Sequence, residues 1–379
     1  MRILYFSRQY TVHDRRFLLK LSQTEHKIFF LRLHENSFEY EKNPPPPGII
    51  SQDKALSGKS IESPEECLSL MSDFEKVIGE FKPDIIHAGP VQTCAFMAAL
   101  SGTCPFIAVS WGYDMLRDAG KNNLYKWATK FTLEKAAHLI CDCEEVKKKA
   151  FETAAYPVAK ITSFPWGIEL ADFSYPPVNF RIRKNLGWED KFVIISTRSW
   201  EKIYGMECLL RAFLSIYRTN KEARLILSGG GSLAPELRKL IDENSIGDYV
   251  HCPGLVPNEK LAEYFSSADL YLSCSLSDGS SISLLEAMAS GLPVVISDLP
   301  GNREWVEEGK NGFFGVTENP ETYAQAFRKI MAMDKNALNK MKLENRKTVE
   351  KRADWNNNFK QLLSAYQEVM KQERKAEHK

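Results

Sequence analysis

The stretch DLYLSCSLSDGSSISLLEAMASGLPVVIS, residues 269–297, contains one complete strand–helix–strand pattern. Residues 269–273 and 293–297 are short apolar runs, which are typical of parallel strands covered on both faces. Residues 281–290 have the pattern of a helix, and Gly291 follows where a helix commonly ends. The stretch therefore predicts a βαβ unit.

The same alternation continues along the whole chain of 379 residues. The other predicted strands are residues 2–6, 27–33, 84–88, 105–110 and 138–142 in a first set, and 191–196 and 224–229 in the second. Alternation of this kind predicts doubly wound α/β domains with parallel sheets. Because the chain is too long for one ordinary core, we expect two domains.

The domain limits follow from prolines and from the tail. DFSYPPV (172–178) predicts a linker, so the first domain is expected over 1–173 and the second over 179–350. Residues 351–379 predict a terminal helix, which has no strand after it and must pack on structure already formed. Its apolar residues at helical spacing are Phe359, Leu362, Leu363, Tyr366 and Met370.

Composition excludes several classes of protein. Lys plus Arg (50) nearly balances Asp plus Glu (49), which gives no general attraction to nucleic acid. No apolar run has the length needed to span a bilayer, and MRILYF predicts a first strand rather than a secretory signal. Eight scattered cysteines indicate reduced thiols in a cytoplasmic protein, and seven dispersed histidines, from His13 to His378, give no obvious metal site.

Two carboxylates flank the start of the helix in the opening stretch. Ser280 or Ser281 is expected to cap this helix, so that its first amides form an anion site. Asp278 lies in the loop before the cap, and Glu286 lies in the second turn. An anion site with an acid on each side suits a nucleotide diphosphate-sugar, whose hydroxyls lie on both sides of its phosphates.

This region resembles the E-x7-E region of retaining glycosyltransferases of the GT-B fold, the glycosyltransferase family 4 or group 1 type. Residues 292–314 continue the resemblance, and four other segments fit in order: 163–173, 196–213, 224–240 and 250–275. The resemblance is strong in the C-terminal half and loose in the N-terminal half. It implies two Rossmann-like domains that face a cleft, with the terminal helix crossing back onto the first domain.

The resemblance also implies roles for residues on the donor side. Glu286 would hold the ribose hydroxyls, and Asp278 would contact the transferred sugar. Arg198 and Lys202 would neutralise the leaving phosphate, a task that suits a guanidinium and an ammonium. The backbone would meet the diphosphate at Ser281, Ile282 and Ser283 and the base at Leu255 and Val256. The glycine run that includes Gly230 is either a tight turn or a further ligand contact.

Several positions depart from the family pattern. Asp278 stands where Glu is more common, and Lys202 is displaced by two because Tyr204 precedes Gly205. The usual glycine pair after the first strand is replaced by SRQYTVHDRRF (7–17), and Trp111 stands where many members have histidine. Candidates for acceptor contacts are then His13, Asp14, Arg15, His87 and Asp114. Asp14 and Arg15 could equally start a helix, and His87 could be a structural histidine.

KNNLYKWATKFTLEKAAH (121–138) has two interpretations. Leu124, Trp127, Ala128 and Phe131 share a helical face that is surrounded by lysines. The segment is either a core-packing helix with snorkelling lysines or an interfacial helix for an anionic membrane surface.

The resemblance thus implies a metal-independent enzyme without a cofactor. It would move a sugar from a nucleotide diphosphate-sugar to a hydroxyl acceptor, such as a surface glycan or a lipid-linked sugar, with retention of configuration. Its expected location is cytoplasmic, either free or in peripheral contact with the inner face of the membrane. The alternatives are a nucleotide-sugar epimerase of the same fold and a non-catalytic nucleotide-sugar-binding subunit.

Overall fold

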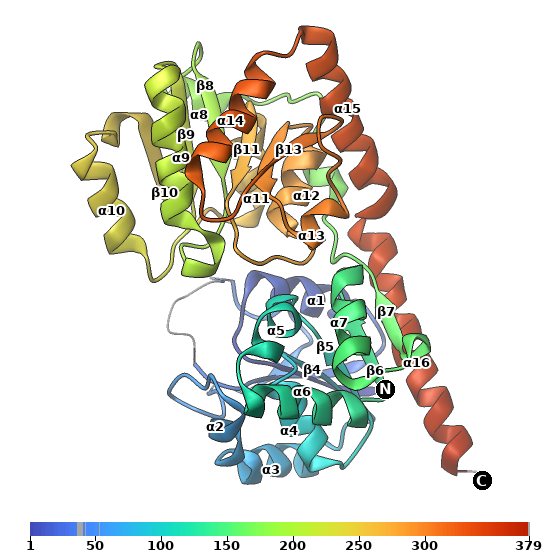
Figure 1. Cartoon of the computed structure of the whole chain (residues 1–379). Helices are drawn as coiled ribbons and strands as arrows, with labels where there is room; N and C mark the ends of the chain where they lie inside the picture. The colour runs from blue at the N-terminus through green and yellow to red at the C-terminus, as the bar shows by residue number, and fades with distance from the viewer. Residues whose placement is uncertain (36–40, 42, 53, 378–379) are drawn as a thin grey trace. The chain divides into compact units, whose positions relative to one another are not determined.

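The computed structural model of the chain describes residues 1–35, 41, 43–52 and 54–377 (Figure 1). His378 of the predicted histidine set and the end of the predicted terminal helix lie outside the described residues. The chain forms two compact units, Met1–Phe164 with the segment that starts at Asn357, and Pro165–Asn356.

The division between the units falls before the predicted linker at 172–178. Ile168 and Phe173 are buried in a core of the second unit. The backbone amide of Ile168 also donates to the carbonyl of Ala353, 2.8 Å away. These contacts place the residues after Phe164 in the second unit, although the sequence pattern assigned them to the first.

The first unit contains a parallel sheet with the strand order β3-β2-β1-β4-β5-β6-β7. The strands are β1 (Arg2–Ser7), β2 (Lys27–Arg32), β3 (Ile50–Ser51), β4 (Ile85–Gly89), β5 (Phe106–Val109), β6 (His138–Cys141) and β7 (Ile161–Ser163). The helices before the second unit are α1 (Val12–Ser22), α2 (Pro64–Leu68), α3 (Met71–Phe81), α4 (Cys94–Ser101), α5 (Tyr113–Leu116), α6 (Asn123–Lys135) and α7 (Glu144–Ala154). Strands β4, β5 and β6 are buried along their whole length, as continuous apolar runs predict.

The second unit contains a parallel sheet with the order β10-β9-β8-β11-β12-β13. Its strands are β8 (Phe192–Ser196), β9 (Ala223–Ser228), β10 (Val250–Gly254), β11 (Leu270–Ser273), β12 (Val294–Ser297) and β13 (Gly312–Gly315). Its helices are α8 (Arg181–Leu186), α9 (Met206–Thr219), α10 (Ala234–Glu243), α11 (Asn258–Ser266), α12 (Ile282–Ala289), α13 (Pro300–Arg303), α14 (Pro320–Met331) and α15 (Lys335–Arg352). The opening stretch forms β11, α12 and β12, which confirms the predicted βαβ unit.

The terminal helix α16 (Trp355–Glu377) belongs to the first unit from Asn357 onward. Three of its predicted apolar residues, Phe359, Leu362 and Tyr366, are buried. Burial of one such side chain contributes about 1.5–3 kcal/mol. The hydroxyl of Tyr366 also lies 2.7 Å from Nδ1 of His87 in β4, so the helix is fixed to the first sheet.

Candidate active site

Neighbouring strands of the second sheet place the main donor-side residues. Arg198 follows β8 and Asp278 follows β11. The two strands are parallel neighbours in which Ile195 pairs with Tyr271. In both sheets the strand order reverses at the first strand: β1 lies between β2 and β4, and β8 lies between β9 and β11. The carboxyl ends of the strands at such a switch point commonly bind ligands. The predicted donor residues therefore lie at the edge where the fold favours a site.

The side chains of Arg198 and Asp278 form a nearly buried ion pair. Nη2 of Arg198 lies 2.8 Å from Oδ2 of Asp278, and the two side chains are 8% and 13% exposed. Nη1 of Arg198 donates to the hydroxyls of Ser281 and Ser283, the latter at 3.0 Å. The hydroxyl of Tyr271 in turn lies 2.8 Å from that of Ser283. The structure thus brings together the predicted phosphate-side arginine, the first acid and the start of α12.

Tyr204 explains one departure from the family pattern. Its ring lies against the guanidinium of Arg198, with Cζ 4.1 Å from the ring centroid, a distance typical of a cation–π contact. Gly205 makes this turn possible, because it has φ +60° and a Cβ there would lie 2.0 Å from the carbonyl oxygen of Cys274. The tyrosine at the position of the usual lysine therefore packs against the arginine.

Burial and charge act in opposite directions on the ion pair. Burial alone lowers the pKa of Arg198, but the Asp278 carboxylate and Tyr204 outweigh it, so the pKa is raised. Burial raises the pKa of Asp278, and Arg198 offsets part of that rise. The guanidinium is therefore a permanent buried cation at the start of α12.

Helix α12 begins at one of the two predicted caps. Ser281 is the N-cap, and its hydroxyl accepts from the amide of Leu284. Trp305 donates from Nε1 to the hydroxyl of Ser280, 3.1 Å away, and so fixes the loop before the cap. Glu286 is 6% exposed, and Ile282 starts the helix. The amide end of the helix and the cation of Arg198 both favour a bound oxyanion.

The glycine run packs against the segment that carries Arg198. Gly229 has φ +147°, and a Cβ there would lie 2.4 Å from the carbonyl oxygen of Arg198. The carbonyl of Gly230 accepts from the amide of Trp200 at 2.9 Å. The run therefore forms a tight turn that supports the segment after β8, and a ligand contact at Gly230 stays a prediction.

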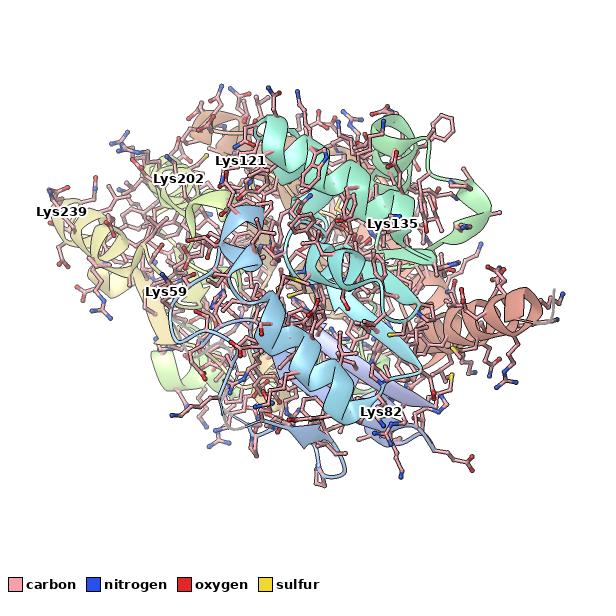
Figure 2. The ribbon with its side chains drawn as sticks, turned by 90° about the horizontal axis from the view of Figure 1, so that it is seen from below. Lys59, Lys82, Lys121, Lys135, Lys202 and Lys239 are labelled. Atoms are coloured by element: carbon pink, nitrogen blue, oxygen red, sulfur yellow. The ribbon has the colours of Figure 1, made fainter. Side chains whose placement is uncertain are left out.

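The remaining predicted donor residues lie nearer to solvent. Lys202 is exposed in the short turn Lys202–Tyr204 (Figure 2). Leu255 and Val256 follow β10 and are half-buried. Of the two predicted phosphate-side cations, only Arg198 is buried among partners.

Three of the predicted acceptor-side residues make internal contacts in the first unit. Asp14 is buried, forms the capping box of α1 with Thr11, and accepts from the hydroxyl of Tyr5 at 3.1 Å. Burial raises its pKa. These contacts support the helix-start interpretation of Asp14, and its acceptor role stays a prediction.

His87 and Asp114 are likewise buried. His87 stacks on Tyr5 at 4.5 Å and contacts Tyr366, and burial lowers its pKa to about 3. Asp114 accepts from the amide of Val91 at 3.0 Å and from the hydroxyl of Ser110 at 2.7 Å. Burial raises its pKa to about 6, and these hydrogen bonds offset part of the rise. Both side chains fix loops and strands, which supports a structural role.

His13 and Arg15 are half-buried on α1. The ring of His13 is tilted against that of Trp111, with centroids 6.1 Å apart. These residues lie in the first turn of a helix that follows β1, at the edge of the sheet where doubly wound folds commonly bind ligands, and their acceptor role stays a prediction.

Two family models match the chain. The model described as "Glycosyl transferases group 1" matches residues 178–348, and the one described as "Glycosyl transferase 4-like" matches residues 2–143. Both models describe glycosyl transferases, and the group 1 model matches the second unit of this chain. The predicted family is therefore confirmed.

Curated relatives of this glycosyl transferase carry related names. It is 32% identical over 160 residues to an alpha-monoglucosyldiacylglycerol synthase of Acholeplasma laidlawii, which covers 41% of this chain and 40% of that protein. It is 26% identical over 309 residues to an uncharacterized glycosyltransferase of Methanocaldococcus jannaschii, covering 78% and 77%. It is 28% identical to a GDP-mannose-dependent alpha-(1-6)-phosphatidylinositol monomannoside mannosyltransferase of Mycobacterium tuberculosis, covering 48% and 50%. The first and third matches thus span half or less of those relatives.

Solved structures share the fold of this glycosyl transferase. Anabaena HepE in complex with UDP has a TM-score of 0.76 at 16% identity, covering 97% of this chain and 100% of that one. A sucrose-phosphate synthase from Thermosynechococcus elongatus has a TM-score of 0.77 at 18% identity, covering 97% and 99%. The predicted GT-B fold is confirmed.

Sequence reasoning missed three residues that support the predicted donor-side residues. The sequence marks Tyr204 only as a departure from the family pattern, and it does not distinguish Tyr271 and Trp305 from other aromatic residues. The sequence signal for Tyr204 was its place directly before the glycine of the arginine-lysine segment. Tyr271 and Trp305 carry no local signal, because their partners, Ser283 and Ser280, lie 12 and 25 residues away in the sequence.

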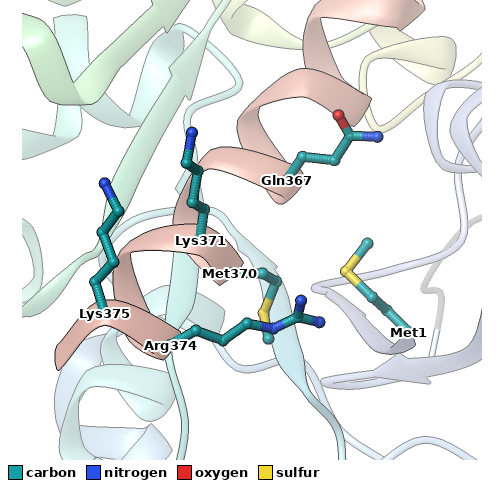
Figure 3. A pocket seen from close by; sticks show the side chains of 6 residues that line it. All are labelled: Met1, Gln367, Met370, Lys371, Arg374 and Lys375. Atoms are coloured by element: carbon teal, nitrogen blue, oxygen red, sulfur yellow. The ribbon is translucent and has the colours of Figure 1, made fainter. Parts of the chain in front are cut away.

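A pocket of about 560 Å³ lies elsewhere, in the first unit, next to α16 (Figure 3). Its lining residues are Met1, Gln367, Met370, Lys371, Arg374 and Lys375. None of them is a predicted site residue. Within the described part of the chain, no group of three or more His, Cys, Asp or Glu side chains could hold a metal ion.

Proposed function

We propose that the chain transfers a sugar from a nucleotide diphosphate-sugar to a hydroxyl acceptor, with retention of configuration. The observation that carries this proposal is the cation of Arg198 at the start of α12, held by Asp278, Ser281 and Ser283. A preformed cation beside helix amides stabilises the negative charge that develops on a leaving diphosphate. Asp278 lies before the start of α12, where it contacts hydroxyls of the sugar. Glu286 lies within α12, where it contacts the hydroxyls of the ribose.

The names of the relatives support the two substrate classes. HepE was solved with UDP, and the Mycobacterium relative is named as GDP-mannose-dependent. The same relative is named for a phosphatidylinositol mannoside and the Acholeplasma relative for a diacylglycerol product. A nucleotide-sugar donor and a lipid-linked acceptor are therefore the substrates we propose, with a surface glycan as the other acceptor class.

Ligand binding and turnover test the proposal. Because a ligand of the folded state raises stability by mass action, one nucleoside diphosphate or nucleotide sugar of a panel should raise Tm. The matching nucleotide sugar and an acceptor extract should then release free nucleoside diphosphate. Stabilisation without release would indicate a non-catalytic binding subunit. The absence of both stabilisation and release would refute the proposal.

We propose that this transfer needs no metal, because Arg198 and the amides of α12 supply the charge stabilisation that a cation would otherwise provide. We expect full activity after treatment with a strong chelator, measured as nucleoside diphosphate release. Loss of activity that is restored by a divalent cation would contradict this proposal.

Glu286→Gln should weaken donor binding without unfolding the protein. A carboxylate accepts hydrogen bonds from hydroxyls more strongly than a neutral amide does, because charge-assisted hydrogen bonds are about twice as strong as neutral ones. Calorimetry should show a donor affinity lower by about tenfold or more. Glu243→Gln on α10 is the matched control, since Glu243 is exposed. Equal donor affinity in Glu286→Gln and the wild type would rule out the ribose contact.

We also propose that α6 contacts an anionic membrane surface. Trp127, on the predicted apolar face of this helix, is 52% exposed and stacks on Phe131 with ring centroids 5.4 Å apart. Lys126 and Lys130 are exposed beside it. Figure 2 labels Lys121 and Lys135 near the two ends of the helix. An exposed aromatic among lysines is the pattern of an interfacial helix. No described helix is long and apolar enough to cross a bilayer.

Liposome sedimentation tests the membrane contact. The wild type should sediment with anionic liposomes and be released by salt, because surface attraction is screened within a Debye length. Lys126→Glu with Lys130→Glu should abolish sedimentation, whereas charge reversal at the exposed Lys239 of α10 should not. Absence of wild-type binding at low salt would leave α6 as an ordinary surface helix.

A further inference from the structure

The segment that follows β1 carries more positive than negative charge. Residues 7–17 contain Arg8, Arg15 and Arg16 but only one acid, Asp14. Asp14 is buried and accepts hydrogen bonds from Thr11 and Tyr5. The single acid of the segment is thus committed to the start of α1, inside the fold.

Arg8 occupies the position in the first sheet where a ligand is expected. It comes directly after Ser7, the last residue of β1, and Ser7 pairs with Gly89 at the end of β4. The chain continues from β1 to β2 on one side, and β4 lies on the other. The carboxyl ends of β1 and β4 therefore form the switch point of this sheet, where doubly wound folds bind ligands.

The guanidinium of Arg8 has an exposed carboxylate as its ion-pair partner. Nη1 lies 3.1 Å from Oε2 of Glu62, and the side chains are 26% and 60% exposed. The cation also lies against Tyr113, with Cζ 5.7 Å from the ring centroid. Since Glu62 stays mostly in solvent, its pairing is weak and another oxyanion can replace it.

The Glu62 loop also connects Arg8 with α6. The hydroxyl of Tyr125 in α6 donates to the backbone carbonyl of Glu62 at 2.7 Å. Lys121, next to the start of α6, lies over the ring of Tyr125 at 4.7 Å. A lipid headgroup at the start of α6 would therefore be close to the loop that pairs with Arg8.

We propose that Arg8 binds an oxyanion of the acceptor, a phosphate or a carboxylate, in the place that the Glu62 carboxylate occupies. This inference rests on the proposed function and adds that the acceptor is anionic. A guanidinium binds such groups through two parallel N–H donors, and the ring of Tyr113 stabilises the cation. The oxyanion belongs to a lipid headgroup or to an acidic sugar, and the two sources share this chemistry.

The test compares matched anionic and neutral ligands on the full chain, in the presence and absence of a saturating nucleoside diphosphate. Dihexanoyl phosphatidic acid is paired with dihexanoylglycerol, and methyl glucuronide with methyl glucoside. In calorimetry, the wild type should bind the anionic member of one pair about tenfold more tightly. The pair that shows the preference identifies the source of the oxyanion.

Two variants assign the preference to Arg8. Arg8→Gln should remove the anionic preference, and Glu62→Gln should increase it, because the competing carboxylate is gone. Arg211→Gln is the matched control, since Arg211 pairs with the exposed Glu207 on α9 of the other unit. It should leave the preference unchanged.

Two results would overturn the inference: no anionic preference in the wild type for either pair, or the same preference in a folded Arg8→Gln. Because Glu62 is exposed, Glu62→Gln gives an independent answer if Arg8→Gln fails to fold, and an unchanged preference there would also count against the site. A preference that depends on Arg8 but occurs in a chain that binds no nucleotide would refute the proposed function and retain the anion site.

Discussion

Arg198→Ala should lower turnover by about two to three orders of magnitude, the effect of removing one preorganised donor to a developing oxyanion. Arg198 is the buried cation at the start of α12, whereas Lys202 is exposed. Lys202→Ala should therefore reduce turnover much less. The measurement is kcat for nucleoside diphosphate release at saturating donor and acceptor.

Stability must be measured beside activity, because Arg198→Ala leaves Asp278 without its ion-pair partner. Breaking a buried pair in this way costs about 3–5 kcal/mol, which denaturant unfolding will detect. Arg198→Lys keeps the charge but loses the forked geometry that contacts Asp278, Ser281 and Ser283 together. We expect its turnover to lie between those of the wild type and Arg198→Ala. Equal losses in Lys202→Ala and Arg198→Ala would reverse the assignment of the phosphate contact.

Much of the fold could be predicted because its signals are local. The continuous apolar runs predict nine of the strands to within one residue at both ends, as at 293–297, where β12 is Val294–Ser297. The four other strands have weaker patterns: β3 and β7 are only two and three residues long, β10 contains a proline, and β13 begins and ends with glycine. The limits of the compact units differ from the predicted domain limits at Phe173, which lies before two prolines but has core partners from much later in the chain.

The local geometry of the proposed donor side could be predicted in part for the same reason. Ser281 and Glu286 follow from the helix start and its period, which a short window contains. The contact between Arg198 and Asp278 joins loops 80 residues apart in sequence, and only the pairing of β8 with β11 brings them together. The buried roles of His87 and Asp114 depend on Tyr366 and on the loop after β4, which no local pattern specifies.

Asp278→Ala should slow transfer by about a hundredfold, because a small displacement near the reacting centre has an effect of that size. The structure adds that Asp278 holds the guanidinium of Arg198, so its loss displaces the cation as well as the sugar. The effects of Asp278→Ala and Arg198→Ala on kcat should therefore be strongly non-additive, since residues in contact share their effects. Asp278→Glu should alter donor affinity or sugar preference and keep the chemistry, because the side chain is only one methylene longer. Additive effects of Asp278→Ala and Arg198→Ala would show that the two side chains act separately.

The stronger test asks whether Asp278 forms a bond to the sugar. In the mechanism that the family resemblance implies, the acceptor hydroxyl attacks on the same face of the sugar from which the leaving group departs. The leaving phosphate takes the proton of that hydroxyl. The ion pair with Arg198 favours this view, because a carboxylate held by a guanidinium is a weaker nucleophile than a free one. A nucleophilic Asp278 would instead give a glycosyl-enzyme that mass spectrometry can trap, and azide would rescue Asp278→Ala. We expect neither result, and we expect the product anomer to match the donor by NMR. A trapped adduct on Asp278, or an inverted product, would replace the positioning role with a covalent mechanism or an inverting one.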